Sequence, residues 1–259
     1  MKVAILPDST AIGTIAADQF EDLLRRTPEA VVGLATGSSP LPLYDELVDR
    51  TAAGRLSFAQ ARAFTLDEYV GLPEGHPQSY RSVIHRDLVD RVDLPQHAVA
   101  SPDGNAEDLR GEAARYDASI REAGGIDLQL LGIGTDGHLA FNEPGGSLAS
   151  RTHVGVLTGR TRQDNARFFG DDLDAVPTRC LTQGLGTIME ARKLVLIATG
   201  ASKATAVREM VEGAVSALWP ATLLQFHPDV LVLLDEDAAS GLALSDYYRE
   251  VWRTEAELF

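Results

Sequence analysis

Short apolar runs alternate with amphipathic segments along the whole chain, and this alternation constrains the fold more than any other feature. The runs at 3–6, 30–36 and 127–131 have the length and the continuous apolar character of strands buried on both faces. The segments between them carry apolar residues at helical spacing, as Ile12, Ala16 and Phe20 do. The alternation predicts an α/β fold with three layers, a largely parallel Rossmann-like sheet with helices on both faces.

The same pattern gives approximate element positions. We expect strands at 3–6, 30–36, 61–66, 127–131, 193–199 and 230–234, and helices at 9–26, from about 41, at 78–89 and at 106–121. Residues 147–182 show no clean strand period and are expected to be irregular, with an active-site lid around 157–182. No Pro/Gly/Ser-rich linker divides the chain, so we expect a single domain spanning 1–259.

Composition excludes several classes of partner. The formal net charge of −15 argues against nucleic acid, because the phosphate backbone demands a basic footprint. It leaves a small phosphorylated ligand open, since a local pocket decides that binding. No apolar run approaches the ~20 residues of a membrane span, and the start at Met1 reads as a strand. We therefore expect no membrane partner and a cytoplasmic location. The single cysteine, Cys180, forms no internal disulfide.

Ionisable side chains follow the strand at 127–131 directly, within a glycine-rich stretch. Glycines at 132, 134 and 137 allow sharp turns or close approach of a ligand. Asp136, His138 and Glu143 should therefore emerge just past the carboxyl end of the strand, where open α/β sheets bind ligands. Carboxylates that flank a histidine orient its imidazole for proton transfer. The alternative is a quietly packed His138 beside solvated acids, which the glycine spacing disfavours.

Three other strand ends carry polar groups of the same kind. Asp67 follows the run at 61–66 and would face the same cleft, although a helix N-cap is the alternative. The turn Thr36-Gly37-Ser38-Ser39 follows the run at 30–36 and precedes a helix, so its free N–H groups suit an anion. Lys203 follows the run at 193–199 and would offer an ammonium group to a phosphate.

Taken together, these motifs resemble the glucosamine-6-phosphate deaminase family, whose members convert the amino-sugar phosphate to fructose 6-phosphate and ammonia. The resemblance extends in order over nearly the whole chain. Its carriers are GLATGSSP at 33–40, DEYVGL at 67–72, GIGTDGHLAFNEP at 132–144, SLASRT at 147–152 and GASKA at 200–204. Such a series of matches is far more specific than any one of them.

The resemblance implies a role for each matching residue. Asp67 would be the base that moves the C2 proton, and His138 would open the pyranose ring. Asp136 and Glu143 would support His138. The turn Thr36-Gly37-Ser38-Ser39, together with Arg167 and Lys203, would hold the 6-phosphate of the substrate. The resemblance implies neither a metal nor an organic cofactor.

The chain departs from one part of the family pattern. Members activated by N-acetylglucosamine 6-phosphate have basic and hydroxyl residues after the match at 147–152, where this chain has His153-Val154-Gly155-Val156. Gly145-Gly146 likewise offers no hydroxyl. An anion site without such groups would be poor. We therefore predict no strong allosteric activation, and homo-oligomeric assembly stays open.

Two other functions compete with the deaminase. A 6-phosphogluconolactonase shares the expected fold, the glycine-rich turn and a similar Gly-Asp-Gly-His run, but the segments at 67–72 and 142–144 favour the deaminase. A non-enzymatic sugar-phosphate sensor domain would need a basic DNA-binding face, which the acidic composition disfavours. The choice between glucosamine and galactosamine epimers rests on one or two hydrogen bonds and stays open.

Overall fold

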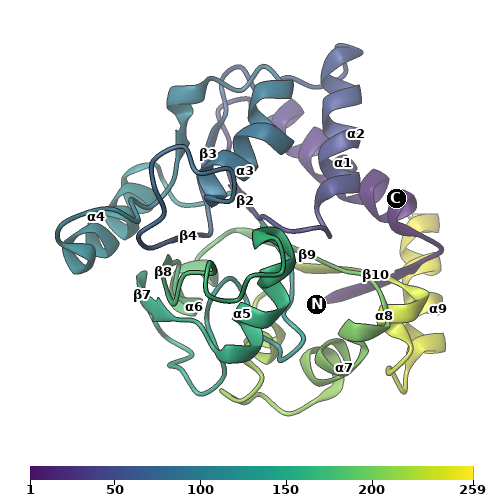
Figure 1. Cartoon of the computed structure of the whole chain (residues 1–259). Coiled ribbons are helices and arrows are strands. Elements are labelled where there is room, and N and C mark those ends of the chain that lie inside the picture. Colours follow the sequence, from purple (N-terminus) through teal and green to yellow (C-terminus); the bar gives the residue numbers. More distant parts are fainter. Residues whose placement is uncertain (259) are drawn as a thin grey trace.

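A seven-stranded parallel sheet forms the centre of the computed structural model, which describes residues 1–258 (Figure 1). The strand order is β1-β10-β9-β6-β2-β3-β5, and every neighbouring pair is parallel. The strands are β1 Lys2–Leu6, β2 Val31–Leu34, β3 Arg62–Thr65, β5 Val99–Ala100, β6 Leu128–Leu131, β9 Lys193–Ala198 and β10 Val230–Asp235. The predicted largely parallel α/β sheet is confirmed.

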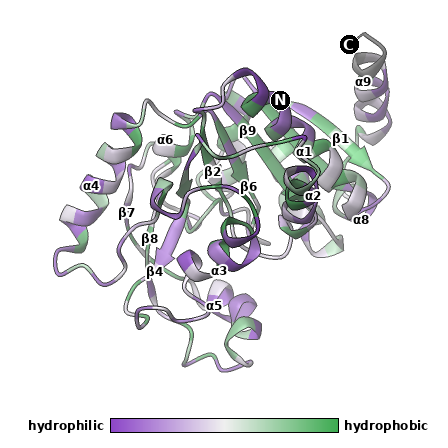
Figure 2. Ribbon diagram, turned by 90° about the horizontal axis from the view of Figure 1, so that it is seen from above, coloured by the Kyte–Doolittle hydropathy of each residue, from purple (hydrophilic) through white to green (hydrophobic). Residues whose placement is uncertain are grey.

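Helices flank this sheet, and their apolar sides close the core. The helices are α1 Ser9–Arg26, α2 Leu41–Ala52, α3 Tyr80–Asp87, α4 Leu109–Glu122, α5 Gly159–Ala166, α6 Leu185–Ile188, α7 Ala204–Glu212, α8 Glu236–Ala239 and α9 Ser245–Leu258. Figure 2 shows the central strands in the green of hydrophobic residues, with hydrophilic purple concentrated on helices such as α4. Burial of the strands on both faces explains why their sequences read as continuous apolar runs.

Side chains cap the N-termini of three helices, and two of these helices begin a few residues later than predicted. Asp8 caps α1 by accepting from the N–H of Ala11. Ser79 caps α3, and Asp108 caps α4, so these helices begin later than residues 78 and 106. Each cap satisfies a backbone N–H that the helix itself leaves free.

The expectation of an irregular segment at 147–182 was wrong in part. Strands β7 His153–Val156 and β8 Arg179–Thr182 lie within it and join β4 Asp67–Tyr69 in an antiparallel sheet of order β4-β8-β7. The strands are short and pair with partners far along the chain, so no local period reveals them. Helix α5 and the 3₁₀ turn Arg167–Phe169 lie between β7 and β8.

The two sheets meet at Leu66, the single residue that separates β3 from β4. The backbone N–H of Gln183, just after β8, donates to the Leu66 carbonyl over 2.8 Å. The side-chain amide of Gln183 donates to the Thr65 carbonyl over 3.0 Å. The backbone at the start of β4 is therefore fixed by both sheets.

No helix among residues 1–258 combines the length and the apolar character needed to cross a membrane.

A buried carboxylate on α4 ties this helix to the segments before β7 and within α6. Asp117 accepts from the hydroxyls of Thr187 and Thr152 over 2.6 and 3.0 Å and from Nη2 of Arg151 over 2.8 Å. Burial alone would raise the pKa of Asp117, but these donors outweigh burial and lower the pKa to about 2. The stabilisation from its ionisation is thus present above the ordinary aspartate pKa and is lost as the pH falls towards 2.

We expect Asp117→Asn to lower the free energy of unfolding by roughly 1.5–3 kcal/mol at neutral pH, because hydrogen bonds to a charged acceptor are lost. Urea denaturation measures this loss. The control is Glu190→Gln, which removes the more exposed carboxylate partner of Arg151 and should cost less than about 1 kcal/mol. Equal losses in the two variants would contradict the assigned importance of Asp117.

Candidate active site

A cavity of about 330 Å³ lies at the edge of the large sheet where the parallel strands end. The loops that enter it follow β9, β6, β2 and β3, which are neighbours in the sheet. The chain runs from β2 to β3 and β5 on one side and returns to β6 on the other, so β2 and β6 form the topological switch point where such sheets bind ligands. Predicted site residues in its lining are Thr36, Gly37, Ser38, Ser39, Asp67, His138, Arg167 and Lys203.

The imidazole of His138 lies against the backbone of Gly134, within the loop that follows β6. A Cβ atom at position 134 would lie 2.3 Å from the ring, closer than any real contact. The N–H of Gly134 donates to the His138 carbonyl over 2.9 Å, and Gly137 turns the chain with a φ of +82°. The imidazole can therefore lie here only because residue 134 is a glycine.

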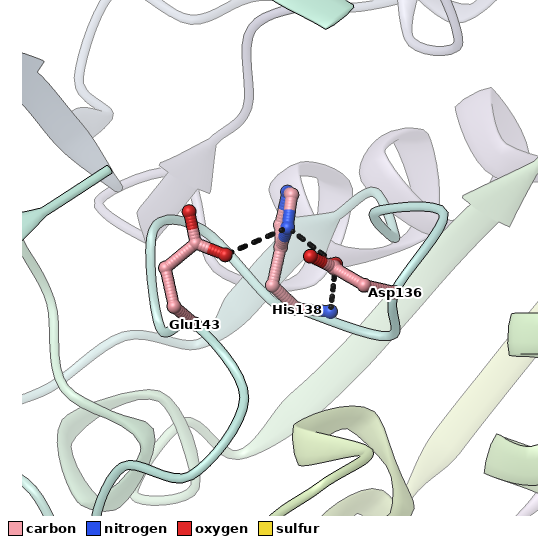
Figure 3. Close-up of side chains that lie close together, drawn as sticks. All are labelled: Asp136, His138 and Glu143. Carbon is pink, nitrogen blue, oxygen red and sulfur yellow. Dashed lines mark hydrogen bonds and ion pairs between the residues drawn. The ribbon is translucent and has the colours of Figure 1, made fainter. Parts of the chain in front are cut away.

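Two carboxylates stand behind the imidazole and do not line the cavity (Figure 3). Nδ1 of His138 lies 2.7 Å from Oδ1 of Asp136 and 3.6 Å from Oε2 of Glu143. Burial would raise the pKa of Asp136, but the contact with His138 outweighs burial and lowers the pKa to about 2. Asp136 is thus ionised at neutral pH and orients the imidazole through Nδ1. With Nδ1 facing the acids, Nε2 is the nitrogen available to a ligand.

The donor atoms of Asp136, His138 and Glu143 lie within 4.8 Å of one another, and these residue types bind divalent cations. A cation there would bind Nδ1 of His138 and both carboxylates. It would thereby replace the direct contacts between Nδ1 and the carboxylates that otherwise orient the ring. The expectation of a site without metal stays a prediction.

Asp67 enters the cavity from the start of β4, and its side chain is only 5% exposed. Asp67 lies within a strand, so the alternative of a helix N-cap was wrong. Burial, reinforced by the charge of Glu68, raises the pKa of Asp67 well above its usual range. No hydrogen bond to its carboxylate is found in the described part of the chain to offset this. A carboxylate with a raised pKa is a stronger base near neutral pH.

Glu68, the next residue, points away from the cavity because successive side chains of a strand alternate. Its carboxylate accepts from the N–H groups of Tyr80 and Arg81, each over 2.9 Å, at the start of α3. One acid of the Asp67-Glu68 pair thus holds a helix, and the other faces the cavity.

The turn at 36–39 is held at its base by Tyr44 of α2. The Tyr44 hydroxyl donates to the Ala35 carbonyl over 2.6 Å and accepts from the Ala35 N–H over 3.2 Å. Gly37 has a φ of +104°, which favours glycine. Within residues 1–258, no acceptor is found for the N–H groups of Gly37, Ser38 and Ser39. These groups are therefore available to an anion.

Arg167 and Lys203 bring positive charge to the cavity lining. Neither forms an ion pair with a carboxylate among the described side chains, and the Arg167 guanidinium lies 4.7 Å from the Phe168 ring centre. Burial lowers the pKa of Lys203; the charge of Asp164 opposes this and that of Arg167 adds to it. Both cations are available to a bound phosphate.

Sequence reasoning missed several further residues of the lining, among them Tyr69, Tyr80, Arg86 and Asn165. Aromatic residues next to apolar ones read as core, and Arg86 reads as the solvated side of a helix. The motif DEYVGL contains Tyr69, and its position two residues after Asp67 was the one available signal, since it places both side chains on the same strand face.

Segment 157–169 contacts the loop that carries His138, at Glu143 and at Thr135. The N–H of Thr158, the cap of α5, donates to Oε1 of Glu143 over 3.0 Å. Nε of Arg160 donates to the Thr135 hydroxyl over 2.9 Å. A third contact joins Nδ2 of Asn165 to the Tyr69 hydroxyl over 2.9 Å.

Comparison with known proteins assigns the class that this fold and cavity define. Residues 9–232 match the family model described as glucosamine-6-phosphate isomerases/6-phosphogluconolactonase, and the chain belongs to this family. It is 65% identical over 253 residues to glucosamine-6-phosphate deaminase of Mycolicibacterium smegmatis, with 98% of this chain and 97% of that one covered. It is 60% identical over 252 residues to glucosamine-6-phosphate deaminase of Beutenbergia cavernae, with 97% of each chain covered.

Solved structures agree with this assignment. A monomeric glucosamine-6-phosphate deaminase superposes with a TM-score of 0.91 at 41% identity, over 93% of this chain and all of the other. The 6-phosphogluconolactonase of Trypanosoma cruzi superposes with a TM-score of 0.76 at 20% identity, over 93% of this chain and 97% of that one. The second likeness shows the fold alone. The predicted resemblance to the deaminases is confirmed.

We expect Asp67→Asn to raise the free energy of unfolding, because the neutral amide removes the cost of burying a carboxylate. The raised pKa means that this cost is absent below the ordinary aspartate pKa and grows as the pH rises towards the folded-state pKa. The advantage of the variant in urea denaturation should therefore grow as the pH rises above the ordinary aspartate pKa. Glu107→Gln, at an exposed position, is the control. A destabilised Asp67→Asn variant would contradict the assigned burial cost.

Proposed function

We propose that the chain is a glucosamine-6-phosphate deaminase, which isomerises and deaminates D-glucosamine 6-phosphate to D-fructose 6-phosphate and ammonia. One observation carries the proposal: Asp67 and His138, from two separate strand ends, line the same cavity as the anion-ready turn at 36–39. Relatives of this name at 60–65% identity support the same substrate. Lactone hydrolysis has less support, since the structural likeness to that class is near 20% identity.

The first step is opening of the pyranose ring, which needs a proton at the ring oxygen. His138 would present Nε2 to the substrate, while the ionised Asp136 orients the ring through Nδ1. His138 would give the ring oxygen a proton and take one from the hydroxyl on C1, which leaves an open-chain aldehyde. Positioned acid–base groups contribute about 10²–10⁴-fold each.

The second step is movement of a carbon-bound proton. Asp67 would take the proton from C2 and return it to C1. The oxygen on C1 gains a proton and the amine nitrogen on C2 loses one, so that the amine becomes an imine and C1 carries a hydroxyl. The high pKa of Asp67 suits this task, since a carboxylate of ordinary pKa is a weak base at neutral pH. Water then adds to the imine carbon, and ammonia leaves as the ketone of fructose 6-phosphate forms.

The phosphate would bind at the far end of the cavity. The free N–H groups of Gly37, Ser38 and Ser39 suit its oxygens, and Arg167 and Lys203 supply the opposing charge. The net charge of −15 makes such a local concentration of donors necessary.

The sequence predicts a lid around 157–182. Segment 157–178 would act as this lid, whereas β8, which ends the predicted range, would stay in place as part of the small sheet. The contacts of Thr158 with Glu143 and of Arg160 with Thr135 would form in the closed state, which excludes water from the site. We also propose that residues 1–259 form a single domain.

Regulation and assembly also remain proposals. Residues 153–156, where activated members of the family have basic and hydroxyl groups, form strand β7 and offer few anion donors. We therefore expect no strong activation by N-acetylglucosamine 6-phosphate. The related solved deaminase is monomeric, and a homo-oligomer stays an alternative for this chain. A cytoplasmic location fits the single cysteine.

We expect Asp67→Asn to bind glucosamine 6-phosphate but to release no ammonia. In deuterated water, NMR should show exchange of the C2 proton with the wild type and none with the variant, because the amide is no base. A coupled assay for 6-phosphogluconolactone hydrolysis, run in parallel, tests the competing function. Near-normal exchange by the variant would overturn the role of Asp67.

We expect Gly134→Ala to lower kcat by at least about 10-fold, because the added Cβ displaces the His138 ring. Gly159→Ala is the matched control, since its added Cβ meets open space at an exposed position. Steady-state ammonia release measures both variants. Equal activity of the two would contradict the dependence of the site on the position of this imidazole.

A further inference from the structure

Tyr69 lies beside Asp67 on the cavity face of β4. The two residues are two positions apart in the strand, so their side chains share a face, while that of Glu68 points to the other. Both Asp67 and Tyr69 line the cavity. The Tyr69 ring packs among Tyr80, Phe141 and Phe169, with ring centres 4.8–5.6 Å away. The ring is therefore fixed, and its hydroxyl has a defined position.

Both lone pairs of the Tyr69 hydroxyl are already used. The Tyr80 hydroxyl donates to it over 3.3 Å, and Nδ2 of Asn165, in α5, donates to it over 2.9 Å. A phenolic hydroxyl has two acceptor positions and one proton. No acceptor for that proton is found among the described side chains and backbone groups. The proton is therefore left for a group inside the cavity.

The hydroxyl also keeps its proton under working conditions. Burial raises the pKa of Tyr69, so the group remains neutral well above neutral pH. The charge of Asp67 raises the pKa of Tyr69 further. A neutral hydroxyl beside the base is a hydrogen-bond donor and no competing base.

The reaction proposed above creates a need for such a donor. When Asp67 takes the proton from C2, the electron pair of the C2–H bond forms a C1–C2 double bond. The pair of the C1 carbonyl bond moves to the oxygen on C1, which becomes negative. Catalysis is strongest where fixed donors point at the atom on which charge develops. That atom is two bonds away from C2, the carbon whose proton Asp67 takes.

On the basis of the proposed function, we propose that Tyr69 is a further catalytic residue, whose hydroxyl donates to the oxygen on C1 while Asp67 removes the C2 proton. Tyr80 and Asn165 are positioning residues, because they act through the Tyr69 hydroxyl. Asn165 belongs to the lid, so closure of the lid completes the orientation of this donor.

The test is Tyr69→Phe, which keeps the ring and removes the hydroxyl. We expect kcat for ammonia release to fall by roughly 100-fold, as for removal of one oxyanion donor, with KM changed less than about 3-fold. Exchange of the C2 proton should fall in parallel. Affinity for the reduced analogue 2-amino-2-deoxyglucitol 6-phosphate, which has no C1 carbonyl, should be unchanged. Tyr247→Phe, at an exposed position, is the matched control.

A second variant, Asn165→Asp, keeps the Tyr69 hydroxyl but offers a carboxylate that accepts its proton. We expect kcat to fall, and the same change to have little further effect in the Tyr69→Phe background. This variant also covers the case in which Tyr69→Phe fails to fold, as judged by circular dichroism.

A kcat within about 3-fold of the wild type for Tyr69→Phe, or full additivity of the two changes, would overturn the role of Tyr69. A wild-type chain that releases no ammonia from glucosamine 6-phosphate would instead overturn the proposed function itself.

Discussion

The backbone leaves the parallel sheet at Leu66 and enters the antiparallel sheet at Asp67, and this change of sheet decides where the buried acid stands. Strand β3 ends at the carboxyl edge beside β2, so the next residue would otherwise lie in a mobile loop. Instead β8 pairs with β4, and Gln183 binds the carbonyls of Thr65 and Leu66. In its proposed role as a base, Asp67 would therefore need little reorganisation.

The surroundings of two carboxylates in the site shift their pKa values in opposite directions. Asp67 is buried beside a second acid, which raises its pKa, whereas Asp136 lies against His138, which lowers its pKa to about 2. One acid is therefore suited to exchange a proton, and the other to stay charged beside the imidazole. Pairs of groups whose environments push their pKa values apart are the usual sign of acid and base assignments.

Much of the fold was predictable because the large sheet is buried on both faces, which leaves continuous apolar runs in the sequence. The small sheet was not, since β7 and β8 are short and β8 pairs with β4, which lies more than a hundred residues earlier in the sequence. The glycines at 134 and 137 marked the loop of His138 without revealing that the imidazole lies against residue 134.

Some polar residues of the cavity could be predicted from the sequence, and others could not. Asp67, His138 and the turn at 36–39 were predictable because each directly follows a buried strand. Tyr69 and Asn165 were not predicted, because their importance depends on one hydrogen bond between segments that the sequence does not connect. The role of a residue that acts through such a contact becomes apparent only in three dimensions.

The most direct test of the central claim is a crystal structure of this chain with 2-amino-2-deoxyglucitol 6-phosphate, an open-chain analogue of the substrate. The account predicts C2 of the analogue within about 3.5 Å of an Asp67 oxygen. It also predicts the phosphate on the N–H groups of residues 37–39, with Lys203 in contact. A complex with C2 turned away from Asp67, or with the phosphate at the opposite end of the cavity, would contradict it.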